Sequence, residues 1–205
     1  HRDLHSFPTR RSSDLKAGWL GFLQVWESAR KLNQVVLDIA RQANLDLISF
    51  PPSASLFSQK GQVVSWNTAS LEHALENGLI PLVYGDVVFD KVLGGTIFST
   101  EELFAHLATV LHPSRILLAG KEEAVFADYP RNQHPIRHIS RSAGLESYLQ
   151  SSDNQDVTGG MRSKVSQMQA ICNANPGTSV EIFRASLPGE LLKALSGTHS
   201  GTIIS

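Results

Sequence analysis

Residues Asp156–Lys164, with the sequence DVTGGMRSK, combine residue types that bind phosphate groups. The adjacent glycines Gly159 and Gly160 allow backbone N–H groups to approach an anion closely. Lys164 adds a positive charge, and a helix predicted to begin near Met161 would point its N-terminal N–H groups at the same place. The patterns GxxxxGK[ST] and GxGxxG are both missing from the chain. The segment therefore predicts one side of a phosphate site, with the other side unaccounted for.

Two further positions offer groups for an anion or for catalysis. Gly85 and Asp86 follow the predicted strand LIPLVYG, where glycine leaves room for a ligand and aspartate is able to order reacting groups. An aspartate that closes a turn is an equally good interpretation. Ser99 and Thr100 open a predicted helix whose N terminus favours an anion, although Ser99 and Glu102 also fit a capping box.

Composition limits the classes of function. The chain has 205 residues, a formal net charge of -1, 41% hydrophobic and 18% charged residues, which predicts one globular domain and neither a nucleic-acid nor a membrane partner. A single cysteine, Cys172, excludes an internal disulfide and is expected to be buried. His134 and His138 are separated by Pro135, which disfavours a helical metal-binding pair, so no metal site is predicted. Without an apolar run long enough to span a membrane, a cytoplasmic protein is expected.

The elements that must position these groups follow from the apolar periodicity. Helices are predicted over 17–43, 68–78, 99–112, about 140–150, 161–173 and 188–197, and strands over 45–50, 62–66, 79–85, 114–120, 179–183 and 201–205. Residues 91–99 are predicted to return as a hairpin arm that turns at Gly94 and Gly95. Strands that alternate with helices predict an α/β fold with a mostly parallel sheet, in which ligands bind at the carboxyl ends of the strands.

The first residues differ in character from the rest. His1–Leu15, HRDLHSFPTRRSSDL, matches codon by codon the translation of a DNA sequencing adapter. We therefore expect residues 1–15 to be non-native and residues 16–205 to be one domain that is incomplete at its N terminus. A genuine basic arm is the alternative.

The order of the motifs resembles the amino acid kinase superfamily. The motifs are IPLVYGDVVFD, GGTIFSTEELFAHLA, SRILLAG, DVTGGMRSK and a terminal GT strand. Within the superfamily, the pairing of YGDVVFD with DVTGGM resembles the isopentenyl phosphate kinases. This resemblance implies a three-layer αβα fold and a homodimer. It also implies transfer of a phosphoryl group from ATP, with Mg²⁺, to isopentenyl phosphate, which gives the isoprenoid precursor isopentenyl diphosphate.

The resemblance assigns the nucleotide side. Gly159, Gly160 and Lys164 match the family's ATP loop, and Lys164 is expected to neutralise charge on the transferring phosphoryl group. Gly120 and Lys121 stand where many members have a TDVDGV segment, so we expect them near the nucleotide despite the changed residues. A solvated lysine is the alternative at both lysines.

The resemblance also assigns the acceptor side. Asp86 is expected to order the catalytic groups, and Gly85 and Ser99 to contact the substrate. Thr100 takes the place of a family glycine whose N–H meets the substrate phosphate. Phe22, Trp26 and Arg30 lie on the helix that, in the family, roofs the pocket for the isoprenoid tail, although an aromatic stripe is more often plain core.

Two family motifs, KLGGS and HGxGSFGH, precede the region that matches from Lys16 onward and do not occur in the chain. We therefore expect the 205-residue chain itself to show no measurable turnover. Two other functions remain open at this point. One is a different phosphate or phosphonate kinase of the superfamily, and the other is a non-catalytic nucleotide-binding protein.

Overall fold

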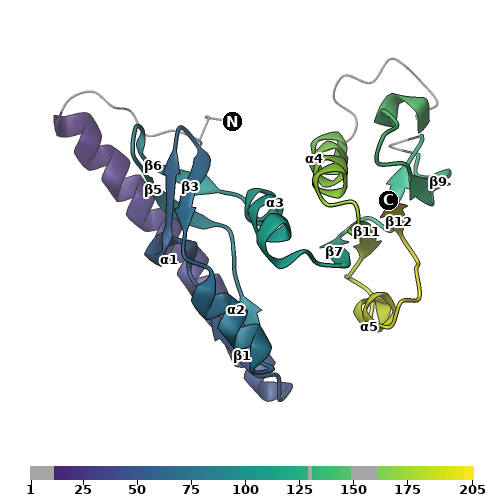
Figure 1. The fold of residues 1–205 in the computed structure, drawn as a ribbon, viewed down its shortest axis with the longest axis horizontal. Helices are drawn as coiled ribbons and strands as arrows, with labels where there is room; N and C mark the ends of the chain where they lie inside the picture. Colours follow the sequence, from purple (N-terminus) through teal and green to yellow (C-terminus); the bar gives the residue numbers. More distant parts are fainter. Residues whose placement is uncertain (1–11, 129–130, 149–160) are drawn as a thin grey trace. The chain divides into compact units, whose positions relative to one another are not determined.

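The computed structural model describes residues 12–128, 131–148 and 161–205, and for residues 12–17 and 145 it describes the backbone alone. The described residues form a mixed α/β protein (Figure 1). The chain divides into two units, His1–Leu103 and Phe104–Ser205, each with its own core.

The first unit contains one long helix, a short helix and several strands. Its elements are α1 (Ser12–Gln42), β1 (Leu47–Ser49), η1 (Pro52–Ala54), β2 (Leu56–Gln59), β3 (Gln62–Trp66), α2 (Ala69–Glu76), β4 (Ile80–Leu82), β5 (Asp86–Asp90) and β6 (Gly94–Phe98). The strand order β3-β2-β5-β6 forms one sheet, and β1 and β4 form a separate parallel pair.

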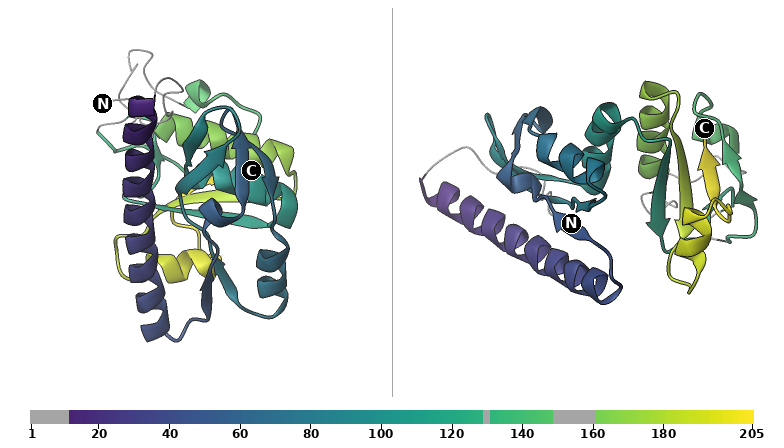
Figure 2. Two further views of the ribbon diagram at one scale, coloured as in Figure 1. Left: turned by 90° about the vertical axis from the view of Figure 1, so that its left-hand side faces the viewer. Right: turned by 60° about the horizontal axis from the view of Figure 1, so that its bottom comes forward.

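Helix α1 confirms the long amphipathic helix predicted from the sequence. Phe22 and Ala40 are both 5% exposed and lie on the side of the helix that faces the strands. Asn33, also buried on this side, accepts a hydrogen bond at 3.0 Å from the Ser49 hydroxyl at the end of β1. Figure 2 shows α1 running alongside the strands of its own unit. The apolar spacing thus fixes which side of the helix packs.

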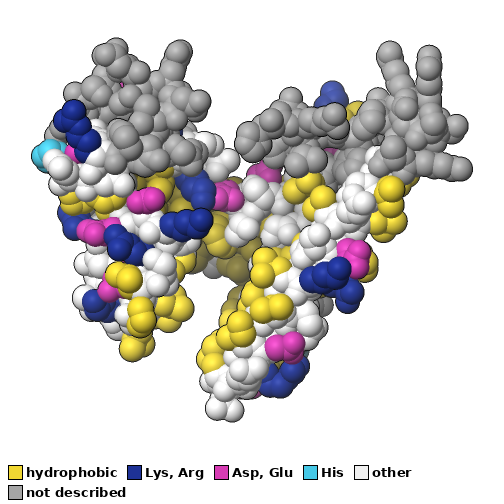
Figure 3. All heavy atoms as spheres, turned by 180° about the vertical axis from the view of Figure 1, so that it is seen from behind, with side chains coloured by type: hydrophobic (Ala, Val, Ile, Leu, Met, Phe, Trp, Pro, Cys, Tyr) yellow, Lys and Arg dark blue, Asp and Glu magenta, His cyan; other side chains and the backbone are white. Residues whose placement is uncertain are grey.

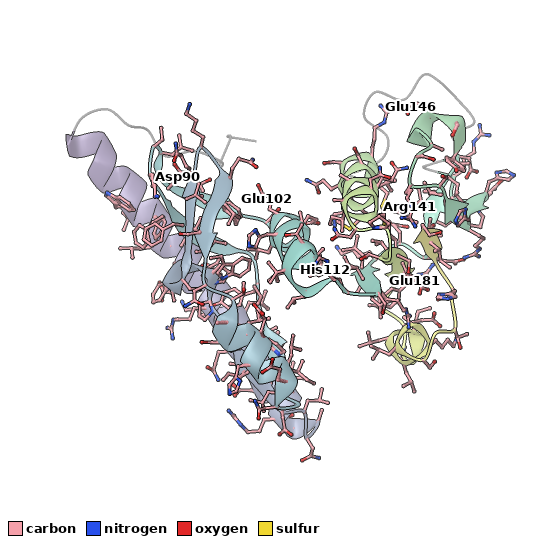
Figure 4. The ribbon with its side chains drawn as sticks, in the orientation of Figure 1. Asp90, Glu102, His112, Arg141, Glu146 and Glu181 are labelled. Carbon is pink, nitrogen blue, oxygen red and sulfur yellow. The ribbon has the colours of Figure 1, made fainter. Side chains whose placement is uncertain are left out.

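The two hairpins of the first unit are joined by one carboxylate. Asp90, at the end of β5, accepts hydrogen bonds from Ser58 Oγ at 2.8 Å and from the N–H groups of Lys60, Gly61, Val92 and Leu93 at 2.8–3.1 Å. Figure 4 shows Asp90 at the end of these strands. The carboxylate therefore holds the β2–β3 turn against the β5–β6 turn.

Two sequence predictions for this region are wrong. The strand predicted over 79–85 is shorter, since β4 covers only Ile80–Leu82 and pairs with β1. A separate strand, β5, begins at Asp86 and pairs with β6. The hairpin turns at residues 91–93, ahead of Gly94, which has a φ of +83° and already belongs to β6. Strand β2 was also missed, because its sequence LFSQ is too short to show a clear alternation.

Helix α3 (Thr100–Leu111) joins the two units in sequence. The second unit contains β7 (Arg115–Gly120), β8 (Val125–Phe126), β9 (Pro135–Ile136), β10 (His138–Ile139), η2 (Leu145–Tyr148), α4 (Met161–Ala174), β11 (Ser179–Arg184), α5 (Glu190–Leu195) and β12 (Thr202–Ile204). Its main sheet has the order β10-β12-β11-β7. Of the helix predicted at 140–150, the described residues show only the short η2.

One side of this sheet is covered by α4. Val180 and Ile182 of β11 pack in the same buried cluster as Val165, Met168 and Ile171 of α4. The sequence prediction that a helix begins at Met161 is confirmed, because α4 begins there. Cys172, in the same helix, is fully buried as expected.

The sheets are mixed rather than mostly parallel. Among the described residues, four strand pairs are parallel, namely β1–β4, β10–β12, β11–β7 and β2–β5. Four others are antiparallel, namely β11–β12, β2–β3, β5–β6 and β8–β9. The expected α/β class is therefore present, but a mostly parallel sheet is not what these pairs show.

Candidate functional site

Asp86 is one of two buried carboxylates in the described part of the first unit, the other being Asp90. Its side chain is fully buried and accepts hydrogen bonds from the N–H of Ser53 at 3.2 Å and from its own strand neighbour, Val87 N–H, at 2.9 Å. Burial raises the pKa of Asp86 above its ordinary value, and the hydrogen bonds from Ser53 and Val87 offset only part of that effect. A carboxylate with so little hydration is suited to hold or pass a proton, or to order a charged neighbour.

Gly85 lies against the beginning of α3. A Cβ atom placed on Gly85 would come within 3.3 Å of the Phe98 carbonyl oxygen and within 3.5 and 3.6 Å of Thr100 Oγ1 and N. A side chain at Gly85 would therefore crowd the Phe98 carbonyl. This close packing accounts for a glycine at this position without any bound ligand. The structure thus brings together four of the predicted residues, Gly85, Asp86, Ser99 and Thr100.

The start of α3 is closed by the predicted capping box. The N–H and hydroxyl of Ser99 donate to Glu102 Oε2 at 2.6 and 2.8 Å, and the N–H of Glu102 donates to Ser99 Oγ at 3.3 Å. Figure 4 shows Glu102 at this end of the helix. Ser99 is thus occupied by the cap, while Thr100 is exposed at the helix N terminus, where an anion is favoured.

The predicted tail-binding residues of α1 have different surroundings. Phe22 packs edge-on against Trp19 and beside Phe89, with both ring centroids at 5.3 Å. Trp26 is 37% exposed and carries the guanidinium of Arg30 over its ring at 5.6 Å. Phe22 is therefore part of an aromatic cluster, whereas Trp26 presents a half-open aromatic surface.

An apolar groove of about 480 Å³ adjoins this cluster. It is lined by Trp19, Phe57, Phe89, Asp90, Lys91 and Gly94. Neither Phe22 nor Trp26 lines it, so the groove gives no support to their predicted role as the wall of a tail pocket.

Tyr84 lies close enough to both Asp86 and Arg30 to feel their charges, a proximity that was not predicted from the sequence. Burial and the negative charge of Asp86 raise the pKa of the Tyr84 hydroxyl, while Arg30 acts in the opposite direction. Two signals were available: Tyr84 directly precedes Gly85, and Arg30 lies one helical turn after Trp26. Helix α1 therefore brings a positive charge near Tyr84.

The second unit holds the residues expected on the nucleotide side. Gly120 ends β7, and its carbonyl accepts a hydrogen bond from the N–H of Ala185 at 3.0 Å. Lys121 is exposed directly after this strand end. A Cβ on Gly120 would meet only ordinary contacts, the nearest at 3.8 Å from the Phe183 carbonyl, so the fold does not demand glycine here.

Lys164 lies in the first turn of α4 and is exposed. Gly159 and Gly160 lie outside the described residues, as do Asp156 and Thr158. The expected phosphate loop therefore lies mostly outside the described residues, and its role stays a prediction.

A polar pocket of about 400 Å³ lies at the carboxyl ends of β7 and β11, and we call it the arginine pocket. It is lined by Glu123, Arg137, Arg184, Leu187, Glu190, Lys193, His199 and Ser200. Sequence reasoning missed Arg184, although it directly follows the predicted strand SVEIF and the rule about strand ends applies to it as it does to Gly120. His199, which also lines the pocket, pairs through Nδ1 with the buried Glu181 carboxylate at 2.8 Å.

His134 and His138 contact different side chains. His134 and His138 do not share a helix, as predicted, since they lie beside β9 and in β10. His134 Nδ1 pairs with Asp128 at 3.1 Å, and His138 Nε2 lies 2.9 Å from Ser205 Oγ. Within residues 12–128, 131–148 and 161–205, no group of three or more His, Cys, Asp or Glu side chains is arranged to hold a metal ion. In the same residues no helix is both long and apolar enough to cross a membrane.

Comparisons with known proteins agree on one family. A profile described as the amino acid kinase family matches residues 7–183. The chain is 31% identical to an isopentenyl phosphate kinase of Methanothermobacter thermautotrophicus, over 90% of this chain and 70% of that protein. It is 28% identical to an isopentenyl phosphate kinase of Methanocaldococcus jannaschii, over 90% of this chain and 67% of that protein. A solved isopentenyl phosphate kinase structure matches with a TM-score of 0.81 and 26% identity, over 96% of this chain and 74% of that one.

Proposed function

The chain belongs to the amino acid kinase family, and we propose that its activity is the phosphorylation of isopentenyl phosphate by ATP to give isopentenyl diphosphate. The observation that carries this proposal is the 31% identity to an isopentenyl phosphate kinase across 90% of the chain. The grouping of Gly85, Asp86 and Thr100 around one helix N terminus supports it, because an acceptor phosphate needs such a positive end.

In this proposal the first unit carries the acceptor side. Thr100 and the N terminus of α3 bind the phosphate of the acceptor, and the guanidinium of Arg30 adds positive charge. Asp86, buried and hydrogen-bonded to Ser53, orders these groups. The exposed face of Trp26 offers an apolar surface for the isoprenoid tail, while Phe22 supports it from the core.

The second unit carries the nucleotide side. Phosphoryl transfer is catalysed mostly by positioning and by neutralising charge on the transferred group. Lys164, in the first turn of α4, supplies this charge together with the backbone of Gly159 and Gly160. Gly120 and Lys121, at the end of β7, are proposed to border the nucleotide.

Magnesium is proposed to arrive with ATP. Mg²⁺ is usually held by substrate phosphates, several waters and one or two carboxylates rather than by a cage made of protein alone. This suits a chain whose described residues show no larger group of metal ligands, and Asp86 is a buried carboxylate on the acceptor side. When bound, Mg²⁺ would neutralise phosphate charge.

We also propose that the fold is the three-layer αβα arrangement of the family. The TM-score of 0.81 supports this. A homodimer is proposed as well. It is supported by an exposed apolar stripe on α1, where Leu32, Val35, Val36 and Ile39 are 36–65% exposed. Figure 3 shows hydrophobic side chains at intervals along this helix.

The test is an acceptor trial with ATP and Mg²⁺. It compares isopentenyl phosphate with other phosphates, phosphonates and carboxylates, using the 205-residue chain and the product of the same gene amplified without adapters. Formation of isopentenyl diphosphate and ADP in equal amounts by the second protein supports the proposal, whereas the 205-residue chain is expected to show no turnover. Faster turnover of another acceptor would favour a different kinase of the family. Nucleotide binding by the second protein without turnover of any acceptor would favour a binding protein.

A further inference from the structure

The arginine pocket is separate from the residues assigned to the nucleotide. None of Gly120, Lys121 and Lys164 lines it. Helix α4 packs on Val180 and Ile182 of β11. The pocket takes its walls from the ends of β7 and β11, from Arg137, from α5 and from the loop that follows α5, and Gly120 adjoins it only as the strand partner of Arg184. The pocket therefore lies beside the strand ends of the second unit without belonging to the α4 side of the sheet.

Positive charge converges in this pocket. Arg137 and Arg184 both reach Glu123, with Nη2 atoms at 3.0 Å from Oε1 and 3.4 Å from Oε2. Lys193 pairs with Glu190 at 2.7 Å. Two arginines and a lysine thus face two carboxylates, and one positive charge is left over.

Arg184 is the least satisfied of these cations. Its ion pair to Glu123 is long at 3.4 Å, and among the described residues its buried Nε atom has no hydrogen-bond partner. A guanidinium presents five N–H donors in a planar fork, so Arg184 retains donor capacity. Such a group gains most from an acceptor that carries negative charge.

The part of the wall that carries His199 and Ser200 is held by several polar contacts, one of which is a hydrogen bond from Arg137 to the Ser200 carbonyl. Glu181, 3% exposed, pairs with His199 Nδ1 at 2.8 Å and accepts the N–H of Ser200 at 3.3 Å. The hydroxyl of Ser200 donates to Glu190 Oε2 at 3.0 Å. Figure 4 places Glu181 on its strand in the middle of the unit. The loop that carries His199 and Ser200 is thus fixed to the sheet and to α5, so the pocket is formed in advance of any ligand.

We propose that the arginine pocket binds a small molecule through an oxyanion group, phosphate or carboxylate, which Arg184 and Lys193 hold. A volume of about 400 Å³ suits a metabolite-sized ligand. In the structure, Glu123 provides the carboxylate for both arginines, and a ligand oxyanion would add the acceptor that Arg184 lacks. This binding is independent of the proposed kinase reaction.

The test is a calorimetric titration of the 205-residue chain with inorganic phosphate and, separately, with citrate, at constant ionic strength. We expect saturable binding of at least one probe with a stoichiometry near one. Arg184→Gln and Lys193→Gln should each weaken it at least tenfold. Lys164→Gln, on α4 and outside the pocket, is the matched control and should leave the affinity unchanged.

The outcomes separate this site from the kinase site. Binding of phosphate alone or citrate alone, with the expected variant effects, supports the proposal and identifies the oxyanion. Binding that is lost in Lys164→Gln but kept in Arg184→Gln belongs to the nucleotide side and overturns it, as does the absence of saturable heat with both probes. Lys193 is 55% exposed, so its variant tests the site even if Arg184→Gln fails to fold. A change in the Arg184 Nε–H resonance on addition of the probe gives a second readout.

Discussion

At the residue scale, two aspartates of the same strand have opposite environments. Asp86 begins β5 with two hydrogen bonds and full burial, whereas Asp90 ends it with five hydrogen bonds. Burial alone would raise both pKa values. At Asp90 the N–H groups of Gly61, Leu93 and Val92 and the hydroxyl of Ser58 outweigh burial and hold the pKa well below its ordinary value. One strand therefore carries a carboxylate with a lowered pKa at one end and a carboxylate with a raised pKa at the other.

Asp86→Asn should gain stability relative to the unsubstituted chain as the pH rises. The folded pKa of Asp86 lies above its unfolded value of 3.8, so the carboxyl favours folding when protonated and loses that contribution as pH rises through the folded pKa. The difference in melting temperature, variant minus unsubstituted chain, should become more positive between pH 4 and pH 7. Asp46→Asn, at an exposed position, is the control, and an equal trend in both variants would contradict the account.

Asp90→Ala should destabilise the first unit by about 3 kcal/mol, because each buried N–H that loses its acceptor costs about 1–3 kcal/mol and some of them regain water. The contribution of Asp90 is fully present above its unfolded pKa of 3.8 and is lost as pH falls toward the folded pKa. The difference from the unsubstituted chain, measured by urea unfolding, should therefore narrow below pH 4. Asp38→Ala on the exposed side of α1 serves as the reference, and a loss no larger than its loss would refute the role of Asp90.

At the element scale, the sequence predicted helices and strands best where a single local pattern determines the structure. Helices α1 and α4 and the capping box of α3 follow from apolar spacing and from the residues Ser99 and Glu102. The break between β4 and β5 was missed because it depends on pairing partners, β1 for one strand and β6 for the other, which local sequence does not reveal. The approach of Arg30 to Tyr84 also depends on tertiary packing.

Gly201, directly before β12, lies where there is no room for a side chain. A Cβ at this position would lie 1.9 Å from the Ile182 carbonyl oxygen, which is backbone of the neighbouring strand β11. Gly201→Ala should therefore cost about 1–3 kcal/mol or more in the free energy of unfolding, measured by urea denaturation. Gly177→Ala, where a Cβ meets nothing within 4 Å, is the matched control. Equal stability of the two variants would show that β12 is able to shift away.

At the scale of the whole molecule, the exposed stripe on α1 bears on assembly. Leu32 and Ile39 are 65% and 60% exposed in the single chain, so charged substitutions there remove little packing within the unit. Leu32→Glu with Ile39→Glu should instead shift the sedimentation of the chain from dimer to monomer. Leu192→Glu, at a leucine that is 71% exposed on α5, is the control and should not. A chain that already sediments as a monomer would contradict the proposed dimer.

The central claim is the identity of the acceptor. The measurement that tests it most directly is the mass-spectrometric identification of the product formed from isopentenyl phosphate, ATP and Mg²⁺ by the protein expressed from adapter-free DNA of the same gene. The account predicts isopentenyl diphosphate and ADP in equal amounts, with a large loss of rate in Lys164→Gln. An ATP-dependent product from a different acceptor, with isopentenyl phosphate recovered unchanged, would contradict it.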